Sequence, residues 1–179
     1  MIAFLDFEAS SLNKKSFPVE VAWVFEDGRH RSHLIRPHPD WTDWSDEAER
    51  LHGISRERLE QEGVAVETVA QQMLSELGAH QLFASAPSWD GKWLSALLRA
   101  GGLPRHSLRL KKSDEAFFDV ARLRLGEHMS DTEISALVEG VIRHTEPSKP
   151  LHRALPDALL ERDRFQFVAL EAVKRMQTQ

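Results

Sequence analysis

The chain lacks two residue types altogether, cysteine and tyrosine, in a length of 179 residues. Without cysteine, disulfide bonds and thiolate metal sites are both excluded. A chain with no cysteine is also compatible with a reducing cytoplasm, which is where we expect this protein to be located.

Long apolar runs are missing as well. No stretch approaches the length that a membrane-spanning helix needs, so we expect no membrane segment. The N-terminus has no basic segment followed by a long apolar one, which is the pattern of a secretory signal. The 41% of hydrophobic residues is nevertheless enough for a substantial core, and the length favours one domain over residues 1–179.

An excess of positive charge is the third absence. Acidic residues outnumber basic ones, and the formal net charge is −5. The surface as a whole is therefore not built to attract polyanions. A nucleic-acid ligand would need a local basic patch, or a metal ion acting at the contact point.

The hydrophobic pattern predicts strands first and helices later. Strands are predicted at 2–6, 17–25 and 29–36, with a hairpin signal at Asp27-Gly28 that favours an antiparallel meander. Helices are predicted at 46–53, 56–61, 65–78, 89–100, 113–125, 130–144, 152–161 and 163–176, with further strands at 81–86 and 106–110. This order indicates a mixed α/β domain with a central sheet.

Two acidic residues, Asp6 and Glu8, stand at the end of the first hydrophobic run. Strand residues alternate between the faces of a sheet, so the two carboxylates share one face and Phe7 lies on the other. On a buried strand, two such carboxylates are costly to desolvate and repel each other. A divalent cation with a preference for oxygen ligands, Mg²⁺ or Mn²⁺, removes both problems. An aspartate that only caps a turn would give the same local pattern.

A second acidic position is Asp90, where the strand that ends near Ala86 gives way to a helix. A helix-initiating aspartate accounts for this position equally well.

A third acidic position belongs to the pair His152 and Asp157, five residues apart at the start of a late helix. This spacing puts a histidine at the rim of a site whose carboxylate lies in the first helical turn, although a surface histidine and a solvated aspartate are an alternative.

Taken in order, Asp-X-Glu, a central Asp and His-X4-Asp resemble the motifs of the DnaQ-like 3′–5′ exonucleases, in the histidine-bearing (DEDDh) subgroup. Three further segments also resemble that family: Glu20 in the second strand, Leu51-His52-Gly53-Ile54-Ser55, and the stretch from Phe118 to Leu123 after the fifth strand. The resemblance covers Ile2 to about Ala169 and implies a ribonuclease H-like fold. That fold has a central mixed five-stranded sheet, the first three strands antiparallel, flanked by helices.

The resemblance also implies a reaction. It is hydrolysis at the 3′ end of single-stranded DNA or short RNA, with two Mg²⁺ or Mn²⁺ ions, to release nucleoside 5′-monophosphates. Asp6, Glu8 and Asp157 would hold one ion. Asp6 would bridge to the second, on which Asp90 would act through water. The sister subgroup uses tyrosine as the base, and this chain has none, so the resemblance makes His152 the general base.

Contacts with the substrate are predicted less sharply. By analogy with the family, the candidate side chains are Phe7, Ser10, Leu12, His52 and Trp89. The basic stretch Arg105, Arg109, Lys111 and Lys112 is either a backbone contact or the charged edge of a sheet. Trp41 and Trp44 either stack on bases or pack a loop over the sheet, which we favour.

The chain also departs from the family pattern. Ser11 stands where the family usually has glycine, and Ala86 where it often has asparagine. These changes concern substrate preference and rate more than the chemistry. A nucleic-acid-binding or regulatory module without activity, and a proofreading subunit that needs a polymerase partner, are the competing interpretations. The sequence leaves a homodimer open.

Overall fold

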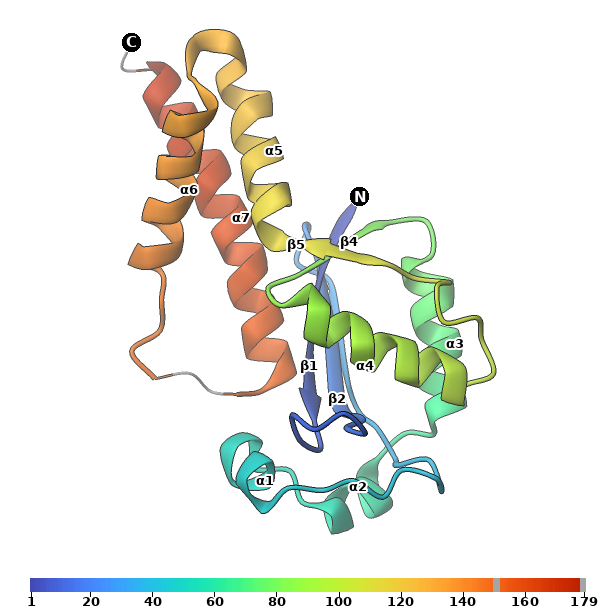
Figure 1. Ribbon diagram of the computed structural model, residues 1–179. Helices are drawn as coiled ribbons and strands as arrows, with labels where there is room; N and C mark the ends of the chain where they lie inside the picture. Colours follow the sequence, from blue (N-terminus) through green and yellow to red (C-terminus); the bar gives the residue numbers. More distant parts are fainter. Residues whose placement is uncertain (150–151, 178–179) are drawn as a thin grey trace.

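The structure, a computed structural model, describes residues 1–149 and 152–177 (Figure 1). Its centre is a five-stranded sheet in the order β3-β2-β1-β4-β5. The strands are β1 (Ile2–Ala9), β2 (Pro18–Phe25), β3 (His30–Leu34), β4 (Gln81–Ala84) and β5 (Leu110–Lys112). The first three pair antiparallel, and β4 and β5 continue the sheet in parallel with β1. The predicted fold class, a mixed α/β sheet with an antiparallel first half, is confirmed.

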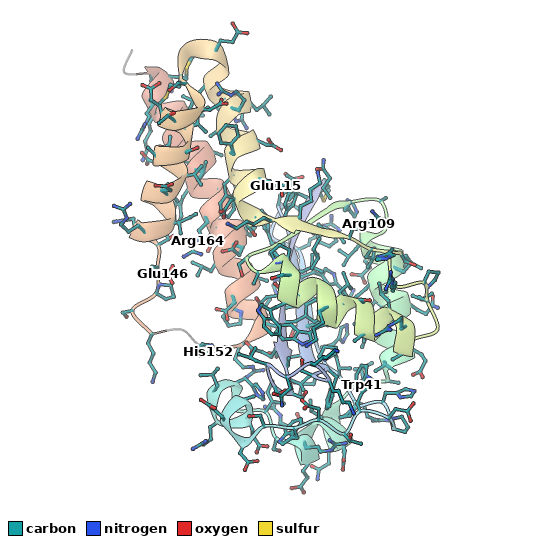
Figure 2. All side chains as sticks on the ribbon, in the orientation of Figure 1. Trp41, Arg109, Glu115, Glu146, His152 and Arg164 are labelled. Atoms are coloured by element: carbon teal, nitrogen blue, oxygen red, sulfur yellow. The ribbon has the colours of Figure 1, made fainter. Side chains whose placement is uncertain are left out.

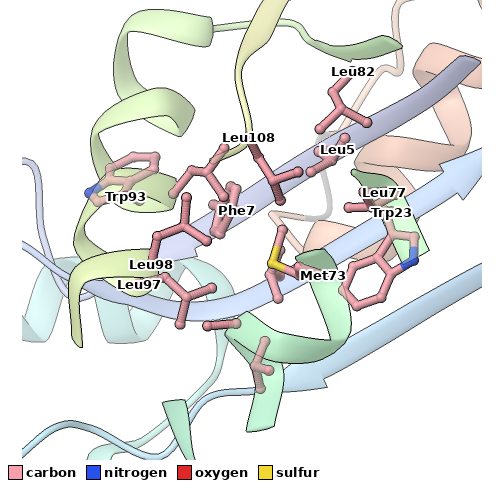
Figure 3. Close-up of a cluster of buried hydrophobic side chains, with 14 of the residues drawn as sticks. Leu5, Phe7, Trp23, Met73, Leu77, Leu82, Trp93, Leu97, Leu98 and Leu108 are labelled. Atoms are coloured by element: carbon pink, nitrogen blue, oxygen red, sulfur yellow. The ribbon is translucent and has the colours of Figure 1, made fainter. Parts of the chain in front are cut away.

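The alternation of β1 and β2 assigns their side chains to two separate cores. Ala3, Leu5 and Phe7 join the cluster on one face, and Phe4 joins the cluster on the other. Asp6 and Glu8 therefore share the face of Phe4, and Phe7 is turned away from them, as the period of a strand requires. Figure 3 shows Phe7 among leucine side chains of the first core.

Two groups of helices cover the two faces (Figure 1). On the Phe7 face lie α3 (Val66–Leu77) and α4 (Pro87–Ala100), whose buried residues complete the first core. On the Phe4 face lie α5 (Ser113–Leu125), α6 (Asp131–His144) and α7 (Ala154–Gln177), with a short 3₁₀ turn, η1 (Gly126–His128), between α5 and α6. None of the described helices is long and apolar enough to cross a bilayer.

A small third core closes one end of the molecule. Here α1 (Asp46–His52) and α2 (Arg56–Glu62) pack beside the sheet, and Ile54 and Leu59 join Phe17 and Val19. Trp41 stacks on Phe17 with ring centroids 5.0 Å apart, and Trp44 contacts the same ring at 6.3 Å. Both tryptophans therefore pack the loop over the sheet, which is the interpretation that the sequence favoured.

Three elements differ most from their predicted bounds. The helices expected at 152–161 and 163–176 form one 24-residue helix, α7, because the Glu-Arg-Asp stretch at 161–163 contains no helix breaker. The strand expected at 106–110 is shorter and later, at Leu110–Lys112, because a turn between Pro104 and Ser107 precedes it and Leu108 packs into the core. The first strand continues past residue 6 to Ala9, with an irregularity in its pairing after Glu8.

The family-like stretch from Phe118 to Leu123 lies within α5, the helix that follows the fifth strand. This position agrees with the helix predicted at 113–125. The residues that follow β5 directly are Ser113 and Asp114, at the first turn of that helix. The helix can begin so early because Glu115 accepts a hydrogen bond from the Lys112 amide, which caps the first turn.

Candidate active site

Three carboxylates from two distant segments converge on the α7 face of the sheet. One ligand oxygen each from Asp6, Glu8 and Asp157 lies within 4.8 Å of the others. Asp6 and Glu8 are neighbours on one face of β1, and Asp157 lies in the first turn of α7. No other group of this kind was found among the described residues. The sequence prediction that these three residues lie together is therefore matched by their positions.

Small side chains allow α7 to come this close to the sheet. Ala154 and Ala158 of α7 pack against Ala22 and Val24 of β2 in a buried cluster. Ala22 is the residue directly opposite Asp6 in the β1–β2 pairing. With three alanines at this contact, the first turn of α7 can lie near β1.

A fourth carboxylate, Asp90, reaches the same region from the first turn of α4. Its side chain is buried, and its Oδ2 atom has no hydrogen-bond partner in the described part of the chain. Burial raises the pKa of Asp90 to about 7. Among the neighbouring charges that act on Asp6, that of Asp90 is the largest. Asp90 therefore faces Asp6, although it lies outside the tight group of three.

The cluster is electrostatically unfavourable as it stands. Burial, followed by repulsion from Asp90, Glu8 and Asp157, raises the pKa of Asp6 well above its ordinary value. Burial and repulsion from Asp157 and Glu20 raise the pKa of Glu8 to about 8. Buried carboxylates are normally paired or bound to a metal. A set of hard oxygen donors with one orphaned carboxylate oxygen fits a divalent cation such as Mg²⁺ or Mn²⁺.

His152 lies immediately before α7, five residues ahead of Asp157. Figure 2 shows it at the start of that helix, at the end of the sheet where α1 lies. Burial raises the pKa of Asp157, and the charge of His152 opposes that effect. The backbone of His152 has φ of 50°, the only positive value for a non-glycine residue in the described ranges.

Glu20 is buried beside this pair and is fully satisfied. Its carboxylate accepts two hydrogen bonds from Arg153, from Nε at 2.9 Å and from Nη2 at 2.7 Å, and one from the Ala154 amide at 3.0 Å. In the sheet, Glu20 is directly opposite Glu8. The family-like glutamate of the second strand thus binds the start of α7 to the sheet.

One acidic residue near the site, Glu161, was not predicted from the sequence. It is buried one helical turn after Asp157, and its charge contributes to raising the pKa of both Asp6 and Asp90. Arg164 donates to Glu161 from Nη1 at 2.8 Å and reaches Glu146 and Thr145 at the end of α6 (Figure 2). The spacing of four residues from Asp157, which puts both on one helix face, was the available signal.

A groove of about 340 Å³ opens beside Glu8. Of the predicted substrate contacts, three line it: Phe7, Leu12 and His52. Leu12 is 72% exposed, whereas Phe7 shows only its edge and otherwise belongs to the core. His52 is buried, and its Nδ1 accepts from the Ile54 amide at 3.1 Å, so it also closes the end of α1.

The other two predicted contacts are placed differently. Ser10 is fully buried, and its hydroxyl donates to Asp43 at 3.2 Å and accepts from the Phe17 amide at 3.1 Å. Trp89 is partly exposed on α4 and stacks on Trp93 at 5.7 Å, outside the lining of the groove. A role for either in substrate binding stays a prediction.

The unusual serine at position 11 has a structural explanation. Its hydroxyl donates to Asp43 and accepts from the Asn13 amide at 2.9 Å. Asn13 Nδ2 donates to the same aspartate at 3.2 Å. Three side chains of the β1–β2 loop therefore converge on Asp43, which fixes one wall of the groove. Ala86, the other departure, precedes α4 and offers no side-chain cap.

The basic stretch lies away from this region. Lys111 and Lys112 are on the edge strand β5, and Lys112 pairs with Asp114 at 2.6 Å. Figure 2 shows Arg109 on the opposite side of the molecule from His152. These positions favour the interpretation that the charges protect the edge of the sheet.

Comparison with known proteins identifies the fold. No protein-family model matches the chain, and no curated protein matches it significantly. Among solved structures, the zinc-bound complex of Escherichia coli exonuclease I with single-stranded DNA matches with a TM-score of 0.65 at 13% identity, over 98% of this chain and 40% of that one. Another structure of exonuclease I matches at 0.66 and 13%, over 99% and 43%. A product-bound exonuclease I matches at 0.63 and 13%, over 99% and 46%.

These likenesses confirm the predicted ribonuclease H-like fold. At so low an identity they show the fold and leave the activity to the chemistry of the site. The chain spans less than half the length of the exonuclease I chains that it matches.

Proposed function

We propose that this chain is a metal-dependent 3′–5′ exonuclease that hydrolyses phosphodiester bonds at the 3′ end of single-stranded DNA or short RNA and releases nucleoside 5′-monophosphates. One observation carries the proposal: oxygens of Asp6, Glu8 and Asp157 lie within 4.8 Å of one another, and the charges of Asp90 and His152 act on this group. The fold shared with exonuclease I supports a nuclease function. The structure of exonuclease I was solved in complex with single-stranded DNA.

Two Mg²⁺ or Mn²⁺ ions are the cofactors in this proposal. Asp6, Glu8 and Asp157 would hold one ion, and Asp6 together with Asp90 would hold the other, with Asp90 acting through water. Bound divalent ions neutralise phosphate charge and make a water molecule acidic enough to act as nucleophile near neutral pH. The strongly negative pocket, which would repel a phosphate by itself, is thereby made attractive to it.

His152 is the general base of the proposal. Its side chain is partly exposed at the rim, where solvent and substrate can both reach it. A neutral imidazole nitrogen can accept a proton from water and release it to solvent in the physiological range. Asp157, close by on α7, would hold the resulting imidazolium in place by charge.

The groove beside Glu8 would receive the terminal nucleotide. Leu12 projects from its wall and offers an apolar surface to a base, and the edge of Phe7 forms part of the lining. His52 is held by its own backbone contact and would act as a fixed wall. This arrangement brings a sugar–phosphate next to Glu8 without any need for a basic surface.

Retention of the acidic cluster argues against a module without activity. Burying repelling carboxylates destabilises the folded chain, and a protein that only binds nucleic acid gains nothing from it. A proofreading role with a polymerase partner remains compatible with the same chemistry, and it would require a surface beyond the site itself.

The test uses oligonucleotides of DNA and RNA labelled at the 5′ end, incubated with Mn²⁺, Mg²⁺ or a chelator. We expect a ladder that shortens from the 3′ end only when metal is present, with nucleoside 5′-monophosphates in the supernatant. Absence of degradation for both nucleic acids, with protein shown to be folded by circular dichroism, would overturn the proposal. A folded protein that retains oligonucleotides without degrading them would instead be the binding module.

A further inference from the structure

We propose that Glu20 is a positioning residue that acts through Arg153 to hold the backbone of His152 in its unusual conformation, and so aims the imidazole at the site. The catalytic part of this inference rests on the proposed function, whereas the conformational part stands on the contacts alone.

The contacts form a clamp between sheet and helix. Both oxygens of Glu20 bind the guanidinium of Arg153, and Oε2 also accepts from the Ala154 amide. A two-point guanidinium–carboxylate pair is stronger and more directional than a single charged hydrogen bond. Glu20 is only 3% exposed and comes from the middle of the sheet, so it is a fixed point to which the start of α7 is attached.

His152 is the residue that this clamp constrains. Its φ of 50° lies in the left-handed region, which costs a residue with a Cβ roughly 1–2 kcal/mol. Such a conformation persists only where the surroundings over-determine it. Here the next residue is bound through its side chain and the one after through its amide, both to the same carboxylate. Release of those two bonds would let His152 relax to an ordinary conformation, which would turn its side chain.

The position of Glu20 also connects the histidine with the acidic strand. Glu20 stands directly opposite Glu8, and the two like charges repel. The guanidinium of Arg153 opposes that repulsion at Glu8. One arginine therefore compensates two strand glutamates and at the same time fixes the residue that precedes it. This double use gives a reason for an ion pair between a buried glutamate and a partly exposed arginine at this position.

The main variant is Glu20→Met, which keeps the volume of the side chain and removes both carboxylate oxygens, and with them all three hydrogen bonds. Arg153→Lys keeps the charge and removes the fork. The matched control is Glu76→Met on α3. Glu76 also binds one arginine at two points, Arg31, at 3.0 and 3.3 Å, and the pair lies apart from the acidic cluster.

With active protein, Glu20→Met and Arg153→Lys should lower kcat by about 10- to 100-fold, the usual cost of losing an orienting partner. KM and the affinity for Mn²⁺, measured by calorimetry, should change by less than about threefold, since the carboxylates are untouched. Glu76→Met should leave kcat unchanged. A loss of Mn²⁺ affinity as large as the loss of kcat would overturn the inference, because Glu20 would then act on the acidic cluster and not on His152.

A second measurement does not depend on activity. In Glu20→Met, the Ala154 amide should exchange with solvent at least about tenfold faster than in the wild type, and a crystal structure should show His152 with negative φ. Unchanged exchange and an unchanged positive φ would overturn the clamp even if kcat falls. If the wild type releases no nucleotides at all, the proposed function fails, and this measurement still decides the inference. Should Glu20→Met not fold, Arg153→Lys carries the kinetic test and the crystallographic test of the His152 φ angle, since it keeps the carboxylate that accepts from the Ala154 amide.

Discussion

The charge of Asp90 acts on Asp6 and raises its pKa, although Asp6 lies on β1 and Asp90 in the first turn of α4. Within the described part of the chain neither carboxylate pairs with a positively charged side chain, and Asp90 keeps one oxygen without any hydrogen bond. The folded chain thus holds negative groups together at the expense of its own stability. This relationship gives measurable consequences even before any substrate is added.

The first consequence concerns pH. Glu8 and Asp90 have pKa values raised to about 8 and about 7, so the ion-free folded protein keeps protons that the unfolded chain releases near pH 4. The free energy of unfolding must then fall as pH rises from about 4.5 to about 8, because the folded state binds more protons in that window. Thermal melts in chelator should give a lower Tm at the alkaline end, and Mn²⁺ should restore it. A flat profile would contradict the raised pKa values.

Removal of the charge of Asp6 should stabilise the ion-free folded protein. Asp6→Asn should raise Tm in chelator, since it relieves repulsion on Asp90 and Glu8, and it should abolish stabilisation by Mn²⁺. Nuclease activity should fall by at least about 10³-fold, because charge stabilisation by the ions is lost. Asp119→Asn, at an exposed position on α5, is the control and should change none of these. Equal Mn²⁺ affinity in Asp6→Asn and wild type would refute the assignment.

His152→Ala separates proton transfer from ion binding. The loss of a general base lowers kcat by about 10²- to 10⁴-fold. Calorimetry should show that Mn²⁺ binds almost as before, because the carboxylates remain. If Mn²⁺ binding falls together with kcat, His152 acts on the cluster itself and is not the base.

Arg164 should matter for stability through its charge. Arg164→Met leaves buried Glu161 without its partner, beside Asp6 and Asp90, and should cost about 3–5 kcal/mol in chelator. A bound cation supplies the missing positive charge, so Mn²⁺ should reduce this loss. Arg31→Met, in a more exposed pair with Glu76, should cost about 1 kcal/mol or less, with or without Mn²⁺. Denaturant unfolding of both variants, each in chelator and in Mn²⁺, measures these four losses of stability.

Asp43 should control the wall of the groove. Asp43→Ala removes the common acceptor of Ser10, Ser11 and Asn13 and should lower stability by about 1–3 kcal/mol. A looser wall should raise KM for an oligonucleotide several-fold more than it lowers kcat. Asp40→Ala, on the same loop and 91% exposed at its side chain, should do neither. A normal KM in Asp43→Ala would show that this loop does not contact substrate.

Local periodicity was enough to predict the part of the site that lies on regular elements. The alternation of β1 requires Asp6 and Glu8 to share a face, whatever the rest of the chain does. Asp90 could be placed at a strand-to-helix junction from the apolar stripe behind it. The order of elements indicated a mixed α/β domain with a central sheet, and the five-stranded ribonuclease H-like arrangement came from the family resemblance.

Tertiary packing decided what periodicity could not. The single helix α7 includes a buried Glu161–Arg164 pair, which breaks its apolar pattern without breaking the helix. The burial of the Ser10 hydroxyl depends on Asp43, a residue of a distant loop. The left-handed backbone at His152 depends on a glutamate of the second strand. Each of these outcomes requires a partner that no local window of sequence contains.

Successive residues of β1 belong alternately to the acidic face and to the leucine-rich core. The register of this strand therefore determines which side chains lie on each face. Deletion or insertion of a single residue ahead of Asp6 would exchange the two sets, placing carboxylates in the apolar core and Phe7 among the acidic side chains. Substitutions within β1 can therefore be tolerated, whereas a change in its length would shift its register against the rest of the sheet.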